Sequence, residues 1–228
     1  MFQNLINLFF PNVCVGCNSF LLANEKVICT TCRHEIPLTY HHNNLENEAF
    51  KKFYGKIPVA FVSTFVYFHK RGIVQKLIHN LKYKGHEEIG TVMGDWYAME
   101  LQDLPQINTI DCIIPVPIHK RKLRERGYNQ VTTFGKSLSE NLGIAYNDSL
   151  LLRKIYSKTQ TKKNLLRRSE VNDQNIFDVS FSKKDHNKHY LLVDDVLTTG
   201  ATLEMCGQAL LEVPGTRLCL ATIAIADH

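Results

Sequence analysis

Two short apolar runs, each followed by a polar loop and then a helical pattern, constrain the fold of this chain most strongly. The first is CIIPVP at residues 112–117, and the second is HYLLVDDV at residues 189–196. Runs that are almost continuously apolar are typical of strands buried on both faces of a parallel sheet. Because strands and helical stretches alternate along the chain, the sequence predicts an α/β fold with a mostly parallel sheet and helices on both of its faces.

The remaining elements predicted from hydrophobic periodicity continue this alternation. Three more strands are expected, at residues 57–68, 150–153 and 218–227. Four helices are expected, at residues 69–85, 87–102, 129–141 and 203–212. The basic stretch HKRKLRERG at 119–127 is expected to be a loop. This loop and DDVLTTGAT follow the two buried strands, so both should face the crevice beyond the carboxyl ends of the strands.

Four of the seven cysteines form two close pairs near the N-terminus, in the pattern C-x2-C-x11-C-x2-C. Each pair can direct two sulfurs to one ion, and two pairs supply the tetrahedral four-sulfur set that zinc prefers. Disulfides are disfavoured in the cytosol, and no strand–helix pattern of a redox fold surrounds either pair. The spacing therefore predicts a structural zinc site formed by Cys14, Cys17, Cys29 and Cys32.

The predicted zinc site divides the chain into two domains. Residues 1–55 are expected to form a small module that depends on the ion, because so short a segment buries little apolar surface. Residues 56–228 are expected to form the α/β domain. Residues 1–10 carry an apolar face at helical spacing but lack the basic start and the cleavage site of a signal peptide. We expect this stretch to pack on the protein, with a membrane-surface anchor as the alternative, and we expect a cytoplasmic protein without membrane insertion.

The loop after the second buried strand has the composition of a phosphate site. A helix N-terminus presents unpaired N–H groups and the positive end of the helix dipole to an anion. Gly200 allows the backbone to turn sharply, and the neighbouring threonine hydroxyls can donate to phosphate oxygens. Asp194 and Asp195 can accept hydrogen bonds from sugar hydroxyls, or hold Mg²⁺ with its waters. The combination predicts a ligand of the ribose 5-phosphate type.

Basic residues are concentrated in the middle of the chain, although the net charge is only +5. Residues 109–170 contain thirteen Lys and Arg against five Asp and Glu. Such an excess indicates an anionic ligand or nucleic acid, with simply solvated lysines as the alternative. FGKS at 134–137 is no P-loop, because Gln130 stands where the first glycine is required, and there is no dinucleotide-binding GxGxxG.

LLVDDVLTTGAT at residues 191–202 resembles the signature loop with which type I phosphoribosyltransferases bind phosphoribosyl pyrophosphate. Together with the cysteine pairs and PVPIHKRKLRERGYNQ at 115–130, it resembles the ComF family of competence-associated, phosphoribosyltransferase-like proteins over nearly the whole chain. The resemblance implies a type I phosphoribosyltransferase (Rossmann-like) fold behind the zinc module.

The resemblance also implies roles for particular residues. The catalytic residues, which would hold the ribose hydroxyls, are Asp194 and Asp195. The substrate loop around the 5-phosphate would further include Val193, Thr198, Thr199, Gly200, Ala201 and Thr202. The loop that meets pyrophosphate would include Lys122, Arg124, Arg126 and Gly127. A mobile hood over the site would include Lys158, Lys162, Lys163, Arg167 and Arg168.

The implied activity is transfer of the phosphoribosyl group, with Mg²⁺ as cofactor, to an acceptor that the sequence does not identify. Pyrophosphate leaves ribose C1 through a cation-like transition state, so no protein nucleophile is needed. Two alternatives stay open. One is binding of phosphoribosyl pyrophosphate or a related nucleotide without turnover. The other is handling of single-stranded DNA during natural transformation, with a competence helicase as a further partner, although few aromatic residues interrupt the basic segments.

Overall fold

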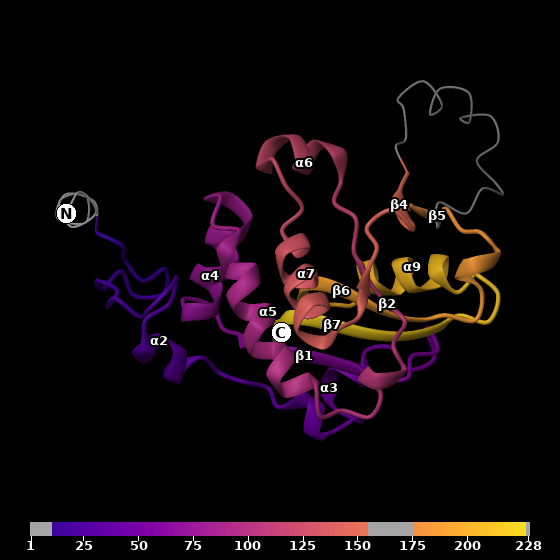
Figure 1. Ribbon diagram of the computed structural model, residues 1–228, viewed down its shortest axis with the longest axis horizontal. Helices are drawn as coiled ribbons and strands as arrows, with labels where there is room; N and C mark the ends of the chain where they lie inside the picture. The colour runs from indigo at the N-terminus through magenta and orange to yellow at the C-terminus, as the bar shows by residue number, and fades with distance from the viewer. Residues whose placement is uncertain (1–10, 155–175, 227–228) are drawn as a thin grey trace.

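The computed structural model describes residues 11–154 and 176–226. At its centre is a parallel sheet of five strands in the order β1-β7-β6-β2-β3. These strands are β1 (Val62–Phe68), β7 (Arg217–Ala226), β6 (His189–Leu197), β2 (Cys112–Pro115) and β3 (Ala145–Tyr146). The predicted α/β class with a parallel sheet is confirmed (Figure 1).

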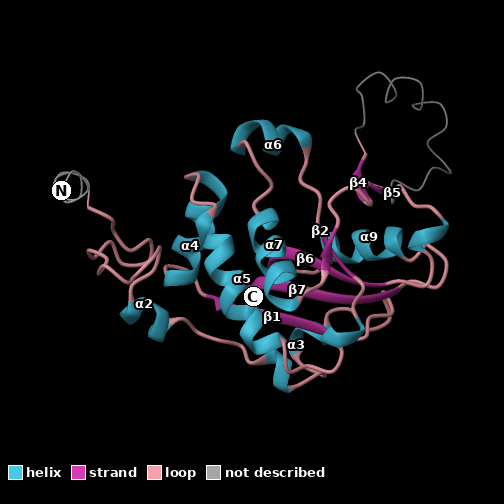
Figure 2. Ribbon diagram, viewed as in Figure 1, coloured by secondary structure: helices cyan, strands magenta, loops and turns pink. Residues whose placement is uncertain are grey.

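Helices cover both faces of this sheet (Figure 2). One face packs against helices α4 (Ile73–Tyr83), α5 (Glu88–Leu101) and α7 (Val131–Leu142). The other face packs against α9 (Ala201–Leu210) and the apolar side chains of residues 49–57. The shorter helices are α2 (Thr30–Glu35), α3 (Glu48–Lys51) and α6 (Lys120–Arg126), with 3-10 turns η1 (His41–Asn43), η2 (Ile107–Thr109) and η4 (Lys183–Asp185).

The two core layers follow from the alternation of side chains along each strand. In β6, Leu191 and Val193 join the layer under α4, α5 and α7, whereas Tyr190 and Leu192 join the layer under α9. A strand keeps this period of two to its end. The next two residues of β6 are therefore directed apart, with Asp195 on the α4 and α7 side and Asp194 on the α9 side.

The prediction of a loop at residues 119–127 is wrong, because most of this segment forms helix α6. His119 caps the start of this helix, since its Nδ1 accepts a hydrogen bond from the backbone N–H of Arg121 at 3.1 Å. Gly127, at φ 82°, ends it in the left-handed conformation that glycine tolerates. None of the residues in α6 is buried, so the helix has no periodic apolar face in the sequence. It projects away from the sheet (Figure 1).

The short strand expected at 150–153 lies outside the main sheet. It forms β4 (Leu151–Arg153), which pairs antiparallel with β5 (Phe177–Val179). β3 and β5 carry no apolar run long enough to be expected from the sequence; each has three residues or fewer. The predicted final strand and the four predicted helices are present as β7, α4, α5, α7 and α9.

The polypeptide before β1 contacts the sheet through its later part. Leu38 forms an antiparallel bridge with Val66, and the Asn47 side chain donates to the carbonyl of Val62 at 2.9 Å. The cysteine-rich part contacts α4 and α5, since Lys76 donates to the carbonyl of Gly16 at 2.8 Å. The division between residues 55 and 56 stays a prediction. Residues 1–10 lie outside the described part of the chain, and no described helix is long and apolar enough to span a membrane.

Candidate functional site

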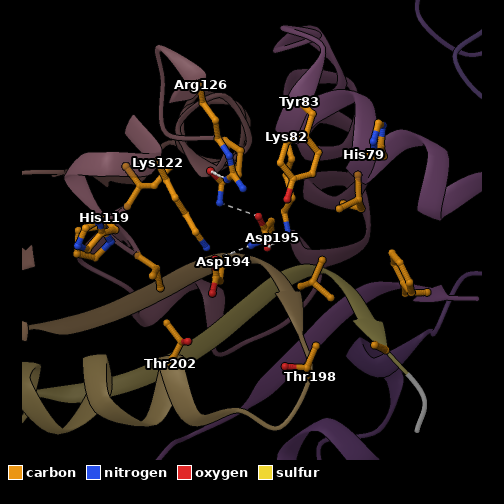
Figure 3. Close-up of a pocket in the computed structure, with 18 of the residues that line it drawn as sticks. His79, Lys82, Tyr83, His119, Lys122, Arg126, Asp194, Asp195, Thr198 and Thr202 are labelled. Carbon is orange, nitrogen blue, oxygen red and sulfur yellow. Dashed lines mark hydrogen bonds and ion pairs between the residues drawn. The ribbon is translucent and has the colours of Figure 1, made fainter. Parts of the chain in front are cut away.

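A pocket of about 570 Å³ lies where the carboxyl ends of the central strands meet (Figure 3). β1 reaches it with Phe68, β7 with Ala226, β2 with the turn at Pro117, and β6 with its two aspartates. Helices α4, α6 and α9 supply the other walls. The predicted crevice beyond the strand ends is therefore present, and both polar loops border it.

The loop between β6 and α9 has the backbone geometry of an anion cradle. Gly200 adopts φ 85°, and a Cβ added to it would lie 3.1 Å from Cζ of Phe53. Gly200 offers no side-chain cap to α9, so Oγ1 of Thr199, which accepts from the N–H of Ala201 at 3.4 Å, takes one of the first N–H groups and the next ones are left for an anion. Residues 198–202 enclose a hollow of about 30 Å³ beside Asp194. Thr198 and Thr202 also line the large pocket.

Asp195 is held by two side chains that the sequence analysis did not identify. Its Oδ1 lies 3.0 Å from Nζ of Lys82, and its Oδ2 accepts a hydrogen bond from Nε2 of Gln130 at 2.7 Å. The Asp195 side chain is only 7% exposed and that of Lys82 is 21% exposed, so the pair is partly shielded from water. An ammonium and an amide as partners fix this buried carboxylate in orientation and satisfy both of its oxygens.

Asp194 has a different environment on the opposite side of β6. Its Oδ1 accepts a hydrogen bond from the backbone N–H of Asp195 at 2.8 Å. Burial, and then the charge of Asp195, raise the pKa of Asp194 to about 8, against the smaller opposing effects of Lys82 and Lys122. Near neutral pH this carboxyl is therefore largely protonated and can both donate and accept hydrogen bonds to sugar hydroxyls.

Helix α6 places two of the predicted pyrophosphate-loop residues in the pocket wall and two elsewhere. Lys122 and Arg126, one turn apart, line the pocket. The Arg126 guanidinium lies 5.0 Å above the ring centre of Tyr83 and donates to Oε1 of Gln130 at 2.6 Å. Arg124 lies outside this lining, and Gly127 serves as the helix cap.

Other parts of the predicted site lie in the core or outside the described residues. Val193 is fully buried and packs beneath the helices. Thr199, Gly200 and Ala201 border the small hollow. The hood residues Lys158, Lys162, Lys163, Arg167 and Arg168 fall in 155–175, outside the described part of the chain.

The sequence analysis missed the wall formed by α4. Gln75, His79, Lys82 and Tyr83 line the pocket and recur at helical spacing. This polar stripe, opposite the buried Leu77 and Leu81, was the available signal, but a solvated helix face has the same pattern. Arg153, from β4, was also missed. Its buried Nε has no hydrogen-bond partner among the described residues, as expected for a donor that meets an anionic ligand.

The four N-terminal cysteines converge as the spacing predicted. Their sulfurs all lie within 4.8 Å of one another, and the Cys17 and Cys29 sulfurs are 3.6 Å apart. Zinc–sulfur bonds of about 2.3 Å in a tetrahedron place sulfurs about 3.8 Å apart, so the set fits one zinc ion. A Cβ added to Gly16 would lie 2.9 Å from Sγ of Cys32, so glycine lets the first knuckle close around the sulfurs.

The cysteine cluster also has thiolate character on its exposed side. Hydrogen bonds with Ser19 lower the pKa of Cys17 to about 6. Burial raises the pKa of Cys32, which lies inside the cluster. Zinc binds the thiolate form, so an ion would displace the proton from the buried thiol and relieve the cost of burying it.

No family model matches the sequence, but known proteins are similar to it over most of the chain. Competence protein F of Haemophilus influenzae is 26% identical over 204 residues, which cover 86% of this chain and 89% of that protein. Competence protein ComFC of Bacillus subtilis is 25% identical over 201 residues, covering 88% and 78%. DNA utilization protein YhgH of Escherichia coli O157:H7 is 30% identical over 140 residues, covering 59% and 60%.

The chain is similar to competence proteins of the ComF family over most of its length. Among solved structures, adenine phosphoribosyltransferase of Leishmania tarentolae aligns over 78% of this chain and 88% of its own, with 14% identity. The TM-score of this alignment is 0.38. The parallel sheet and the cysteine cluster are features of this chain's own structure.

The pocket fits a protein-bound Mg²⁺ less well than the four cysteines fit zinc. Mg²⁺ requires several oxygen ligands in an octahedron. Both oxygens of Asp195 already have partners, and the raised pKa of Asp194 leaves it largely uncharged near neutral pH. Among the described residues, the group of three or more His, Cys, Asp or Glu side chains close enough to hold one ion is the set of four cysteines.

Proposed function

We propose that this pocket binds phosphoribosyl pyrophosphate and that the protein transfers its phosphoribosyl group to an acceptor not yet identified. One observation carries the proposal: a threonine–glycine cradle and a cationic helix face each other across a single pocket, with two aspartates between them. The order of these groups, visible in Figure 3, suits a ligand with a phosphate at one end, a ribose in the middle and a pyrophosphate at the other end.

The proposed roles follow from the chemistry of each wall. Residues 198–202 hold the 5-phosphate at the N-terminus of α9. Asp194 holds a ribose hydroxyl, and Asp195 places its negative charge near C1 as positive charge develops there. Lys122 and Arg126 stabilise the departing pyrophosphate. Positioning of the ligand and exclusion of water supply the rest of the rate acceleration. The hood at residues 155–175, which would exclude the water, stays a prediction.

Mg²⁺, which the family resemblance implies, would supply further positive charge to the pyrophosphate. Any Mg²⁺ in the pocket would come with the ligand, because the described carboxylates do not form an ion site of their own. The cytoplasm stays the expected location of the protein.

Titration of phosphoribosyl pyrophosphate tests the binding. Replacing Asp194 and Asp195 together by Asn should weaken binding about 10- to 100-fold, since a charge-assisted hydrogen bond from Asp195 contributes about 1.5–3 kcal/mol and Asp194 is largely uncharged. Thermal melts must accompany the titration, because the Asn variant loses the Lys82 ion pair. Equal affinity in a folded double variant would remove the proposed site. If the double variant does lose affinity, a screen of nucleobases and amines for pyrophosphate release would identify the acceptor. Pyrophosphate release with none of these compounds would favour binding without turnover.

A second function, in handling single-stranded DNA, is favoured by the exposed basic helix α6 and by the names of the relatives. A DNA site on α6 would show salt-dependent affinity. DNA binding that survives loss of both aspartates would separate this function from the phosphoribosyl site.

A further inference from the structure

The ion pair between Lys82 and Asp195 lies inside the pocket, where a cation would be needed to balance a highly charged ligand. The ammonium and carboxylate are 3.0 Å apart, and the second carboxylate oxygen is held by Gln130. Figure 3 shows the Lys82 side chain directly beside Asp195. An ion pair with 7% and 21% exposed side chains is screened by water far less than a surface pair.

Helix α4 holds the ammonium of Lys82 in place. Leu77, Ile78 and Leu81 are buried and fix the helix against the sheet. The hydroxyl of Tyr128 donates to the carbonyl of Leu81, which ties the last turn of α4 to the start of the segment after α6. Lys82 itself lies in that last turn, where the helix dipole favours a positive charge. Its position is therefore set by the fold and does not depend on a bound ligand.

The charges around the ligand position are already supplied by the chain. Lys82, Lys122, Arg126 and Arg153 all line the pocket. Among the described residues that line the pocket, the carboxylates are those of Asp194 and Asp195. Four cationic side chains can neutralise much of the charge of a phosphate and a pyrophosphate without a metal ion.

We propose that Lys82 is a positioning residue that takes the place of a protein-bound Mg²⁺ beside Asp195, so that the pocket binds phosphoribosyl pyrophosphate as the metal-free anion. The inference rests on the proposed function, because it concerns how the same site accepts its ligand. The ammonium of Lys82 fixes Asp195 and balances its negative charge. The charge of the ligand is then balanced by side chains of the protein and not by a metal ion.

The test is calorimetric titration of phosphoribosyl pyrophosphate into the zinc-loaded protein, with Mg²⁺ and in buffer freed of divalent ions by a chelating resin. The resin treats only the buffer, so the cysteine site keeps its metal. For the wild type, we expect affinities within about threefold of each other in the two buffers. Lys82→Met should weaken binding about 100-fold without Mg²⁺, because Asp195 is left uncompensated beside an anion, and Mg²⁺ should restore part of it.

Two further variants separate this role from a general loss of charge or of stability. Lys82→Arg keeps the positive charge and should bind within about tenfold of the wild type. Lys84→Met removes the same charge two residues away, at an exposed position outside the pocket, and should behave as the wild type. Wild-type binding that falls about 100-fold when Mg²⁺ is removed would overturn the inference. So would a Lys82→Met variant that binds as Lys84→Met does.

Titration of Mg²⁺ alone decides the inference independently of the proposed function. The wild type should bind no Mg²⁺ at the pocket, and Lys82→Met should gain a weak site that Asp195→Asn removes again. If the wild type binds phosphoribosyl pyrophosphate in neither buffer, the proposed function is wrong. Mg²⁺ binding to the wild type that depends on Asp195 would instead contradict the role of Lys82.

Discussion

The cysteine cluster and the phosphoribosyl pocket are each marked by a short motif, but only the first is completed by that motif. The four sulfurs come from residues 14–32 and meet through local turns. The pocket takes one wall from the motif at residues 191–202 and the others from α4, α6 and β4, which lie far away in sequence. A site whose ligands are neighbours in sequence is specified by spacing, whereas a site at strand ends is specified by topology.

Removing one zinc ligand should have the largest effect, because nothing else in the cluster replaces it. Cys29 supplies a sulfur and also caps α2, where its Sγ accepts from the N–H of Cys32 at 3.4 Å. Cys29→Ser should lose the metal and several kcal/mol of stability in the cysteine module, since structural zinc contributes on the order of 10 kcal/mol. Elemental analysis and amide hydrogen exchange over residues 14–32 measure this, with Cys112→Ser, outside the cluster, as the control.

The comparison predicts that this damage stays local. Exchange in α9 should be nearly unchanged in Cys29→Ser, because the core layer beneath this helix contains none of residues 14–32. A variant that retains one zinc per chain, or that unfolds the pocket together with the module, would contradict the independence of the two regions.

Gly200→Ala should have the next largest effect, at the centre of the phosphate cradle. The residue adopts φ 85°, and the added Cβ meets the ring of Phe53, so we expect a loss of about 2 kcal/mol in stability and at least about tenfold in ligand affinity. Gly143→Ala is the matched control, because it has φ 67° but no atom within 4 Å of the added Cβ. It should lose about 1 kcal/mol of stability and no affinity. Equal effects on binding in the two variants would argue against the cradle.

Asp194→Asn should stabilise the protein in a pH-dependent way. Because the pKa of Asp194 is raised to about 8 in the folded state, its contribution to stability is fully present below the unfolded pKa, near 3.8, and is lost as the pH rises through 8. The variant should therefore exceed the wild type by on the order of a few kcal/mol above pH 8, and this gain should vanish toward pH 4. Denaturant unfolding at several pH values measures it. A difference that does not change with pH would mean that Asp194 is not buried as described.

Lys122 and Arg124 provide the smallest and most selective comparison. Both were predicted to meet pyrophosphate, but only Lys122 lines the pocket. Lys122→Ala should weaken ligand binding about tenfold, and Arg124→Ala should change it less than about twofold. Equal losses measured by titration would mean that α6 turns its other face to the ligand.

These contrasts show which parts of the molecule the sequence could predict. The central strands were predictable because each is one unbroken apolar run. The β6–α9 loop was predictable because it directly follows such a run. Helix α6 was not, because a helix without buried residues leaves no apolar periodicity. Lys82 and Gln130 were not, because their meeting with Asp195 depends on how α4 and α7 pack on the sheet. The alternation of side chains in β6 does explain, after the fact, why the two adjacent aspartates have different partners.

Amide hydrogen exchange with and without phosphoribosyl pyrophosphate tests most directly whether one ligand joins these distant walls. The account predicts that exchange slows together in three segments, at residues 79–85, 119–127 and 198–205, and stays unchanged at residues 14–32. Slower exchange in only one of the three segments, or a change confined to the cysteine module, would contradict a single phosphoribosyl pocket built from α4, α6 and the β6–α9 loop.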